Sequence, residues 1–250
     1  MTPPRPVKAR IEKPRAGKGK AKQGPQTRNF TVARAGGATA AHPGAGLAFA
    51  RASFALSVHD PEELPRPGAP ELAFAGRSNA GKSSAINALA GRRRLAFVSK
   101  TPGRTQLINF FALGDRAYLV DLPGYGYAGV PGEVRRHWQH LVGTYVSTRP
   151  SLAAVVVVMD SRHPLTDLDL TLLEWLRAAE RPAHVLLTKS DKLSRQAARA
   201  TLERVRSQLA RLHPGASVQL FSSLKREGIQ EAAARLASLV DDARKKQSPG

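Results

Sequence analysis

Gly76-Arg77-Ser78-Asn79-Ala80-Gly81-Lys82-Ser83 is the stretch of this chain that decides its fold. It follows an apolar run at 71–75 that suits a buried strand, and apolar residues at helical spacing come after it at 84–90. A loop with glycine at both ends can turn its N–H groups inward around phosphate oxygens, and the following helix directs its positive end at the same charge. The pattern therefore predicts a P-loop that binds a nucleoside polyphosphate.

Lys82 and Ser83 carry the chemistry expected of this loop. The Lys82 ammonium reaches the β- and γ-phosphates as a point charge, and the Ser83 hydroxyl is a ligand for Mg²⁺. The other residues expected to line the nucleotide here are Gly76, Arg77, Ser78, Asn79, Ala80, Gly81 and Ser84.

Strand-like and helix-like segments alternate after residue 70. Apolar runs predict strands at 71–75, 107–113, 117–121, 153–159, 184–188 and 218–222. Amphipathic patterns predict helices at 84–90, 133–146, 167–179, 195–212 and 229–240. This alternation is typical of an α/β fold with a mostly parallel sheet, here six-stranded, and helices on both faces. Residues 49–58 fit either an edge strand or a packed lead-in. Ligands of such folds bind at the carboxyl ends of the strands.

Asp121-Leu122-Pro123-Gly124 comes at the end of one predicted strand. A carboxylate here can hold Mg²⁺ opposite Ser83, usually through water, and the Gly124 N–H can approach a γ-phosphate because no side chain intervenes. Upstream, Gly103-Arg104-Thr105-Gln106-Leu107 is expected to reorder with the nucleotide. Thr105 would ligate Mg²⁺ and hold the γ-phosphate through its N–H. Thr101 is the alternative, but Thr105 adjoins the next strand and stays tethered.

Thr188-Lys189-Ser190-Asp191 follows the strand predicted at 184–188, and this T-K-x-D pattern predicts recognition of guanine. The Asp191 carboxylate would accept hydrogen bonds from N1–H and the N2 amino group, and adenine offers neither donor. The Lys189 stem would cover the base while Thr188 braces the loop. After the last strand, Phe221-Ser222-Ser223 would offer backbone amides to guanine O6.

Together these motifs resemble the EngB (YihA/YsxC) family of translation-factor-class GTPases. The resemblance covers about residues 49–240 and rests on the segments 76–84, 101–106, 109–111, 121–128 and 188–192. It implies a Ras-like fold, Mg²⁺-dependent GTP binding with hydrolysis to GDP and phosphate, and a switch role in assembly of the large ribosomal subunit. In older terms the family is needed for normal cell division and septation.

Hydrolysis requires an oriented water and compensation of charge on the γ-phosphate. Lys82, Thr105 and Gly124 are the candidate catalytic residues for the second task. Tyr125, however, stands where Ras-type enzymes have a water-orienting glutamine, so slow intrinsic turnover is expected. Asn79 resembles an asparagine that helps related GTPases bind K⁺ near the phosphates, and K⁺ stimulation is the resulting hypothesis; the alternative is an asparagine that only braces the loop. Tyr125 and Tyr127 either report the nucleotide state or pack against the following helix.

The chain ends differ in composition from its middle. Residues 1–46 hold ten basic residues and one acidic residue, Glu12, with few apolar side chains, which predicts a disordered basic arm. Residues 47–243 form the predicted GTPase domain and 244–250 a short flexible tail. The 29 basic and 18 acidic residues outside the arm also favour a polyanionic partner. We expect rRNA in a precursor of the large subunit rather than DNA; compositional drift is the alternative, and the arm either anchors to rRNA or is inert.

The absence of cysteine excludes disulfides, thiol catalysis and Cys-ligated zinc. The most apolar run, 155–159, is far shorter than the roughly 20 residues that cross a bilayer. These features predict a cytoplasmic protein without a membrane partner, and we expect it to be a monomer. Two other functions remain open: an RNA-binding assembly scaffold with a structural nucleotide, and a partner in tRNA modification, which the lack of cysteine disfavours.

Overall fold

The computed structural model describes residues 47–96, 107–126 and 132–247. Four features predicted from the sequence lie outside these ranges: the basic arm, the segment 97–106 with both candidate threonines, Tyr127, and the last three residues.

The core of the molecule is one mixed sheet with the strand order β1-β3-β4-β2-β5-β6-β7. Its strands are β1 (Ser53–Val58), β2 (Glu71–Gly76), β3 (Ile108–Ala112), β4 (Tyr118–Asp121), β5 (Leu152–Asp160), β6 (Ala183–Thr188) and β7 (Ser217–Leu220). The five from β4 to β7 in this order are parallel, whereas β3 runs antiparallel to β4 and β1 antiparallel to β3. The mostly parallel sheet is confirmed.

The sheet has seven strands rather than the predicted six, because residues 53–58 join its edge as β1. Only the last residue of β1 is buried. An edge strand with so little burial lacks the apolar run by which the other strands were found. The preceding turn, η1 (Phe49–Arg51), is the packed part of the segment, since Phe49 is buried.

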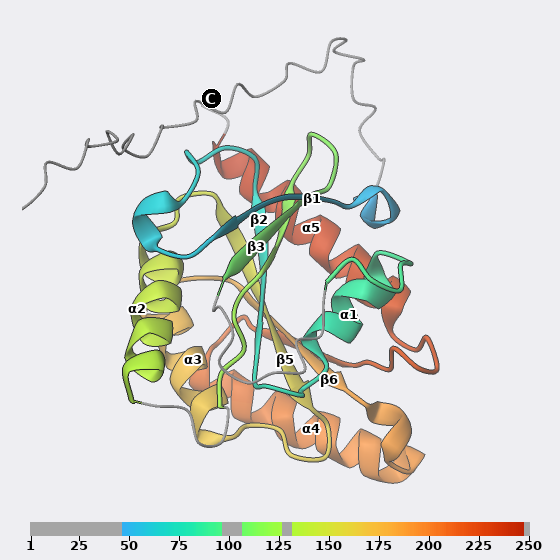
Figure 1. Ribbon diagram of the computed structural model, residues 1–250. Helices are drawn as coiled ribbons and strands as arrows, with labels where there is room; N and C mark the ends of the chain where they lie inside the picture. Colours follow the sequence, from blue (N-terminus) through green and yellow to red (C-terminus); the bar gives the residue numbers. More distant parts are fainter. Residues whose placement is uncertain (1–46, 97–106, 127–131, 248–250) are drawn as a thin grey trace, which may run out of the picture. The chain divides into compact units, whose positions relative to one another are not determined.

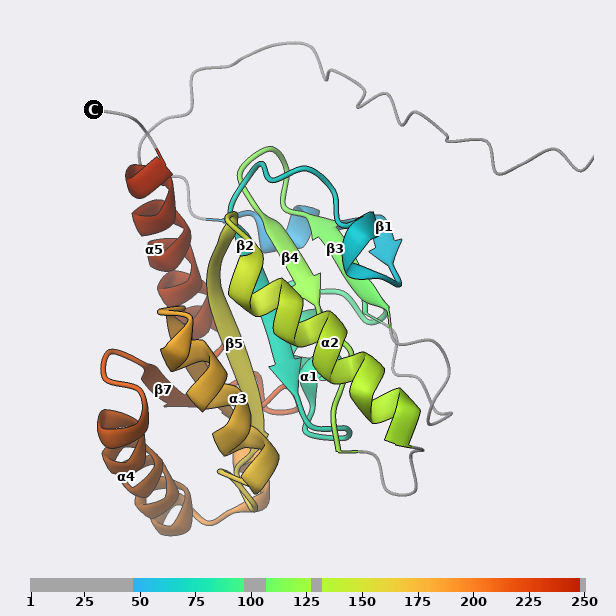
Figure 2. The same cartoon turned by 90° about the vertical axis from the view of Figure 1, so that its left-hand side faces the viewer.

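Helices cover both faces of the sheet (Figures 1 and 2). They are α1 (Lys82–Leu89), α2 (Gly132–Thr148), α3 (Asp167–Ala178), α4 (Arg195–Leu212) and α5 (Ile229–Gln247), with short turns η2 (Pro61–Glu63) and η3 (Ser190–Lys192). Side chains of β5 alternate between the faces: Val155 and Val157 join the core under α2, α3 and α4, and Val156 joins the core under α1 and α5. Burial on both faces explains the continuous apolar sequence of this strand.

Two helix properties bear on the sequence predictions. α5 continues to Gln247, so the first four residues of the predicted tail at 244–250 are helical. Arg244, Lys245 and Lys246 occupy its last turn, where basic side chains favour the negative end of the helix dipole. Across the described ranges, each helix is too short or too polar to span a lipid bilayer.

A closed ionic cluster lies at the amino end of β2. The Glu71 carboxylate, 1% exposed, accepts hydrogen bonds from the guanidinium of Arg149 at 2.6 and 3.0 Å, from the Tyr145 hydroxyl at 2.7 Å and from the Ser151 hydroxyl at 2.7 Å. Arg149 also donates to the carbonyl of Pro65 at 2.6 Å. Because hydrogen bonds from buried protein groups surround both oxygens of this carboxylate, the cluster holds the start of the strand that leads to the phosphate loop.

Candidate nucleotide site

The phosphate loop connects the end of β2 to the start of α1. Gly76 has to be glycine, since a Cβ there would lie 2.7 Å from the carbonyl oxygen of Val158 on β5. Asn79 and Gly81 have φ angles of 62° and 101°, a left-handed conformation that asparagine and glycine tolerate best. The strand–loop–helix context predicted for residues 76–83 is confirmed. The left-handed backbone at position 79 by itself favours asparagine, which supports the interpretation that Asn79 braces the loop.

Lys82 and Asp121 meet at the carboxyl ends of neighbouring strands. Asp121 ends β4, which pairs with β2 through Phe74, and its buried carboxylate accepts a hydrogen bond from the Lys82 ammonium. Ser83 lies beside Lys82 in the first turn of α1. A hydroxyl and a carboxylate form the oxygen-only donor set that Mg²⁺ prefers, so these residues fit the predicted ion. Thr105, the third predicted ligand, lies outside the described residues.

The segment after Asp121 turns back along the phosphate loop. The Ser78 N–H donates to the Tyr125 carbonyl at 2.7 Å, and the Tyr125 N–H donates to the Gly76 carbonyl at 3.3 Å. Gly124 packs between them, because a Cβ there would be 3.5 Å from the Gly76 carbonyl oxygen and 3.6 Å from the Ser78 nitrogen. The loop and the D-x-x-G motif therefore form one hydrogen-bonded unit, a link that neither motif alone predicts.

Tyr125 packs inward. Its ring makes an edge contact with Trp138 of α2 at 5.3 Å between centroids, and its hydroxyl donates to Asp169 of α3 at 2.7 Å. Burial, and then the neighbouring Asp169 carboxylate, raises the pKa of this phenol well above its ordinary value. The Trp138 indole donates to the Pro123 carbonyl at 2.8 Å. The packing interpretation of Tyr125 is confirmed, and its hydroxyl is bound by α3.

The start of the T-K-x-D motif clamps the phosphate loop. The Thr188 hydroxyl donates to the Ala80 carbonyl and, at 3.0 Å, to the Met159 carbonyl. The Lys189 ammonium donates to the Asn79 carbonyl at 2.6 Å. Thr188 was expected to brace the loop of its own motif; in the structure Thr188 and Lys189 both bind carbonyls of the phosphate loop.

Asp191 lies against the segment that follows β7. The Ser222 hydroxyl donates to Asp191 Oδ1 at 2.6 Å, and Ser222 is fully buried. The Lys192 ammonium lies 3.9 Å from Asp191 Oδ2. The two segments expected to contact guanine are therefore adjacent. The sequence assigned Ser222 only a backbone amide, whereas its side chain orients the carboxylate.

Asp160, which the sequence interpretation missed, ends β5 beside Thr188. Its carboxylate accepts hydrogen bonds from the Arg162 guanidinium at 2.6 and 2.9 Å and from the Lys189 ammonium at 2.9 Å. Burial alone would raise the pKa of Asp160, but these hydrogen bonds hold it well below its usual range. The sequence did carry a signal, because Asp160 is a polar residue at the carboxyl end of a buried strand. The same rule located the other motifs.

The remaining predicted residues lie on or beside the same edge of the sheet. Ser84 is in the first turn of α1, Leu107 immediately precedes β3, and Ser190 begins η3. Arg77 bridges to Tyr125, and Leu122 donates its N–H to the Phe74 carbonyl at 3.0 Å. Phe221 is buried and Ser223 follows Ser222. Gly103, Arg104 and Gln106 lie outside the described residues.

Comparison with known proteins bears on this geometry. Residues 71–189 match a family model described as 50S ribosome-binding GTPase. The chain is 59% identical over 203 residues to the probable GTP-binding protein EngB of Azoarcus sp. (strain BH72), covering 80% of this chain and 97% of that protein. The similarly named protein of Methylobacillus flagellatus is 59% identical over 184 residues, with coverages of 74% and 89%. A crystal structure of a probable GTP-binding protein engB shares the fold, with a TM-score of 0.56, 22% identity and coverages of 69% and 99%.

Proposed function

The chain belongs to the EngB family of GTP-binding proteins, and from that premise we propose that this GTPase is a nucleotide-driven switch in assembly of the large ribosomal subunit. The observation that carries the switch is the backbone pairing of Ser78 with Tyr125. Tyr125 in turn packs on Trp138 of α2. A change at the γ-phosphate therefore has a direct path from the loop through the D-x-x-G segment to a helix.

The proposed roles of the site residues are those expected from the sequence motifs. Lys82 and the loop amides would hold the β- and γ-phosphates, and Asp191, oriented by Ser222, would read guanine. Ser83, Thr105 and Asp121 would hold Mg²⁺, which neutralises charge on the phosphate oxygens when it is bound. Gly124 would present its N–H to the γ-phosphate.

Slow intrinsic hydrolysis is part of this proposal. The Tyr125 hydroxyl is bound to Asp169, so it is not directed at an attacking water. K⁺ near Asn79 remains the hypothesis for how the missing positive charge is supplied. Turnover would then be faster in KCl than in NaCl, and Asn79→Gly, which keeps the left-handed backbone, would lose the difference. Equal rates in both salts would remove the K⁺ hypothesis.

The proposed partner is rRNA in a large-subunit precursor, bound by a cytoplasmic monomer without DNA or membrane contacts. The support is the description of the matching family model and the excess of basic residues. The need for normal division and septation would follow from a shortage of ribosomes. Deleting residues 1–46 tests the arm: the slope of log affinity against log salt should fall by about 0.7–0.9 for each phosphate that the arm neutralises. An unchanged slope would make the arm inert.

The decisive experiment is gradient co-sedimentation with large-subunit precursors in GDP, GTP and a non-hydrolysable GTP analogue. We expect stronger association in the GTP-like states. Asp191→Asn, which should weaken guanine binding, is the variant to compare in each nucleotide, and it should lose the nucleotide dependence. Sedimentation that is the same in all states would favour instead the scaffold with a structural nucleotide.

A further inference from the structure

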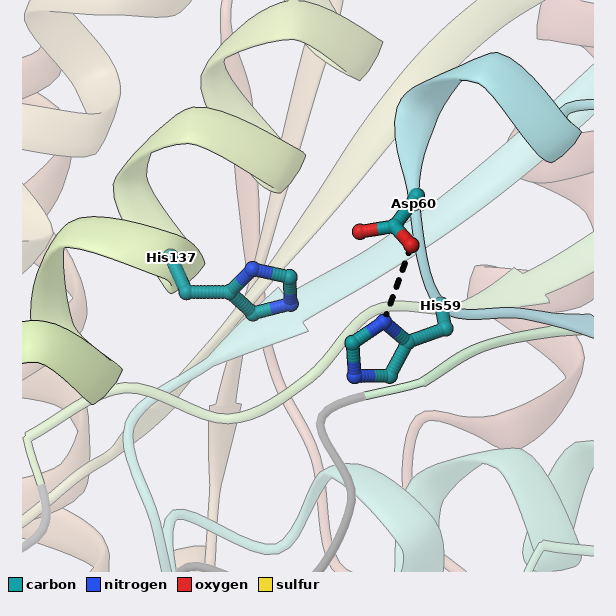
Figure 3. Close-up of side chains that lie close together, drawn as sticks. All are labelled: His59, Asp60 and His137. Carbon is teal, nitrogen blue, oxygen red and sulfur yellow. Dashed lines mark ion pairs between the residues drawn. The ribbon is translucent and has the colours of Figure 1, made fainter.

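We propose that His59, Asp60 and His137 form a binding site for a divalent transition metal, with Zn²⁺ as the ion that fits best. Each residue offers one ligand atom, and these atoms all lie within 4.8 Å of one another. His59 and Asp60 belong to the connection between β1 and η2, whereas His137 belongs to α2 (Figure 3). The fold thus brings together two parts of the chain that lie far apart in the sequence.

The spacing is close to what a zinc ion requires. Zn²⁺ with bonds of about 2.1 Å in tetrahedral geometry places neighbouring ligand atoms about 3.4 Å apart. His59 Nδ1 and Asp60 Oδ2 are already 3.3 Å apart. The wider separations within the group can shorten by rotation of His59, because its side chain is 51% exposed, whereas the Asp60 side chain also caps η2.

His137 supplies an independent observation. Its Nε2 atom is buried and has no hydrogen-bond partner among the described residues. A buried polar atom without a partner costs free energy, and a metal bond would offset that cost. The His59 and His137 rings lie side by side, with centroids 4.8 Å apart and planes tilted by 30° (Figure 3). The site therefore has one buried ligand atom, on the half-buried His137, and two exposed ligands beside it, of which His59 is free to turn toward an ion.

The donor types select the metal. Two imidazoles and one carboxylate favour Zn²⁺ and its neighbours in the first transition row, whereas Mg²⁺ and Ca²⁺ prefer oxygen ligands alone. Three protein ligands leave a fourth position for water. This set also differs from the all-oxygen donors Ser83 and Asp121 of the nucleotide site, so the two sites should take different ions.

A bound ion would tie α2 to the connection after β1. The next residue along α2, Trp138, donates to the Pro123 carbonyl and packs on Tyr125. The metal would therefore restrain α2, the helix that contacts the D-x-x-G segment. The metal's ligands lie outside the nucleotide motifs in the sequence.

The test is a calorimetric titration of the full-length protein with Zn²⁺, in saturating Mg²⁺ and GDP so that the nucleotide site is filled. We expect one Zn²⁺ per chain. His59→Ala and His137→Ala should each bind Zn²⁺ at least about tenfold more weakly, because removing even a residue that only orients a metal ligand costs about 10–100-fold in affinity. His140→Ala is the matched control, because His140 is exposed on the same helix and lies outside the group. The His140→Ala variant should bind Zn²⁺ with the affinity of the wild type.

A spectroscopic and a stability readout complete the test. Co²⁺ in place of Zn²⁺ should give visible ligand-field absorption in the wild type and His140→Ala but not in His137→Ala. Zn²⁺ should raise the unfolding temperature of the first two proteins only. If His137→Ala does not fold, His59→Ala gives the same test, because His59 is exposed and its replacement should leave the fold intact. Equal binding by all variants, or no binding by the wild type, would overturn the site.

Discussion

At the amino end of β2 the carboxylate of Glu71 is enclosed by protein hydrogen bonds, all from buried groups. At the carboxyl end of the neighbouring strands, carboxylates are held by residues that follow other strands: Asp121 by Lys82 in the first turn of α1, and Asp191 by Ser222 after β7. The same kinds of side chain therefore serve two ends of one sheet. At the first end the buried groups satisfy one another, and at the second they belong to the motifs predicted to bind the nucleotide.

Left-handed backbone conformations occur in the phosphate loop and the T-K-x-D motif, where Asn79, Gly81 and Lys189 all have positive φ. Such conformations cost free energy and persist where surrounding contacts hold them. The comparison teaches that substitutions at one end should change binding and those at the other should change stability.

Asp191→Asn should produce the largest effect, and it should be on binding. The variant weakens two charge-assisted hydrogen bonds to guanine, each of about 1.5–3 kcal/mol, so GTP affinity should fall by about 10²–10⁴-fold. Fluorescence titration with a labelled guanine nucleotide measures this. The free energy of unfolding should stay within about 1 kcal/mol of the wild type. Unchanged GTP affinity would contradict the assignment of Asp191 to the base.

Arg149→Met tests the opposite end. It leaves the Glu71 carboxylate buried without its ion partner, which should lower the free energy of unfolding by about 3–5 kcal/mol. Urea denaturation measures the loss, and the GTP affinity of the folded fraction should not change. The double variant Glu71→Gln with Arg149→Met is the control and should recover part of the stability. A loss below about 1 kcal/mol would mean that the cluster does not carry the stability assigned to it.

His184, at the amino end of β6, makes stability depend on pH. Burial lowers the pKa of His184 to about 4. The unfolded chain, with a pKa near 6.5, then binds more protons than the folded chain, so stability falls as pH drops. The loss between pH 7 and pH 5 should be about 2 kcal/mol from this group. Urea titrations at both values should show a smaller loss in His184→Gln. An equal loss in both proteins would exclude His184 as the source.

Tyr125→Phe should have the smallest effect of these variants. It tests whether a hydroxyl within the nucleotide motifs contributes to stability or to hydrolysis. It removes the hydrogen bond to Asp169, so stability should fall by about 1–2 kcal/mol. The single-turnover hydrolysis rate should stay the same, because the hydroxyl is bound to α3. A large drop in that rate with normal stability would instead place the hydroxyl in the reaction.

Some features follow from local sequence because the backbone requirement is local. The loop at 76–83 needs glycine and asparagine where φ is positive or a neighbouring strand is close, and these residues stand in order along the chain. The apolar runs of β2, β5 and β6 reflect burial on both faces. By contrast, the residues of β1 fitted a strand or a lead-in equally well, because an exposed edge leaves no such run.

The sequence by itself thus determined a phosphate loop, its order with the guanine motif and the mostly parallel sheet around them. Only the tertiary structure decided which side chains meet: Ser78 with Tyr125, Lys189 with Asp160, and His137 with His59. Glu71 and Arg149, 78 positions apart, illustrate the reason. Such pairs depend on the order in which strands and helices lie side by side, and residue spacing along the chain carries no record of that order.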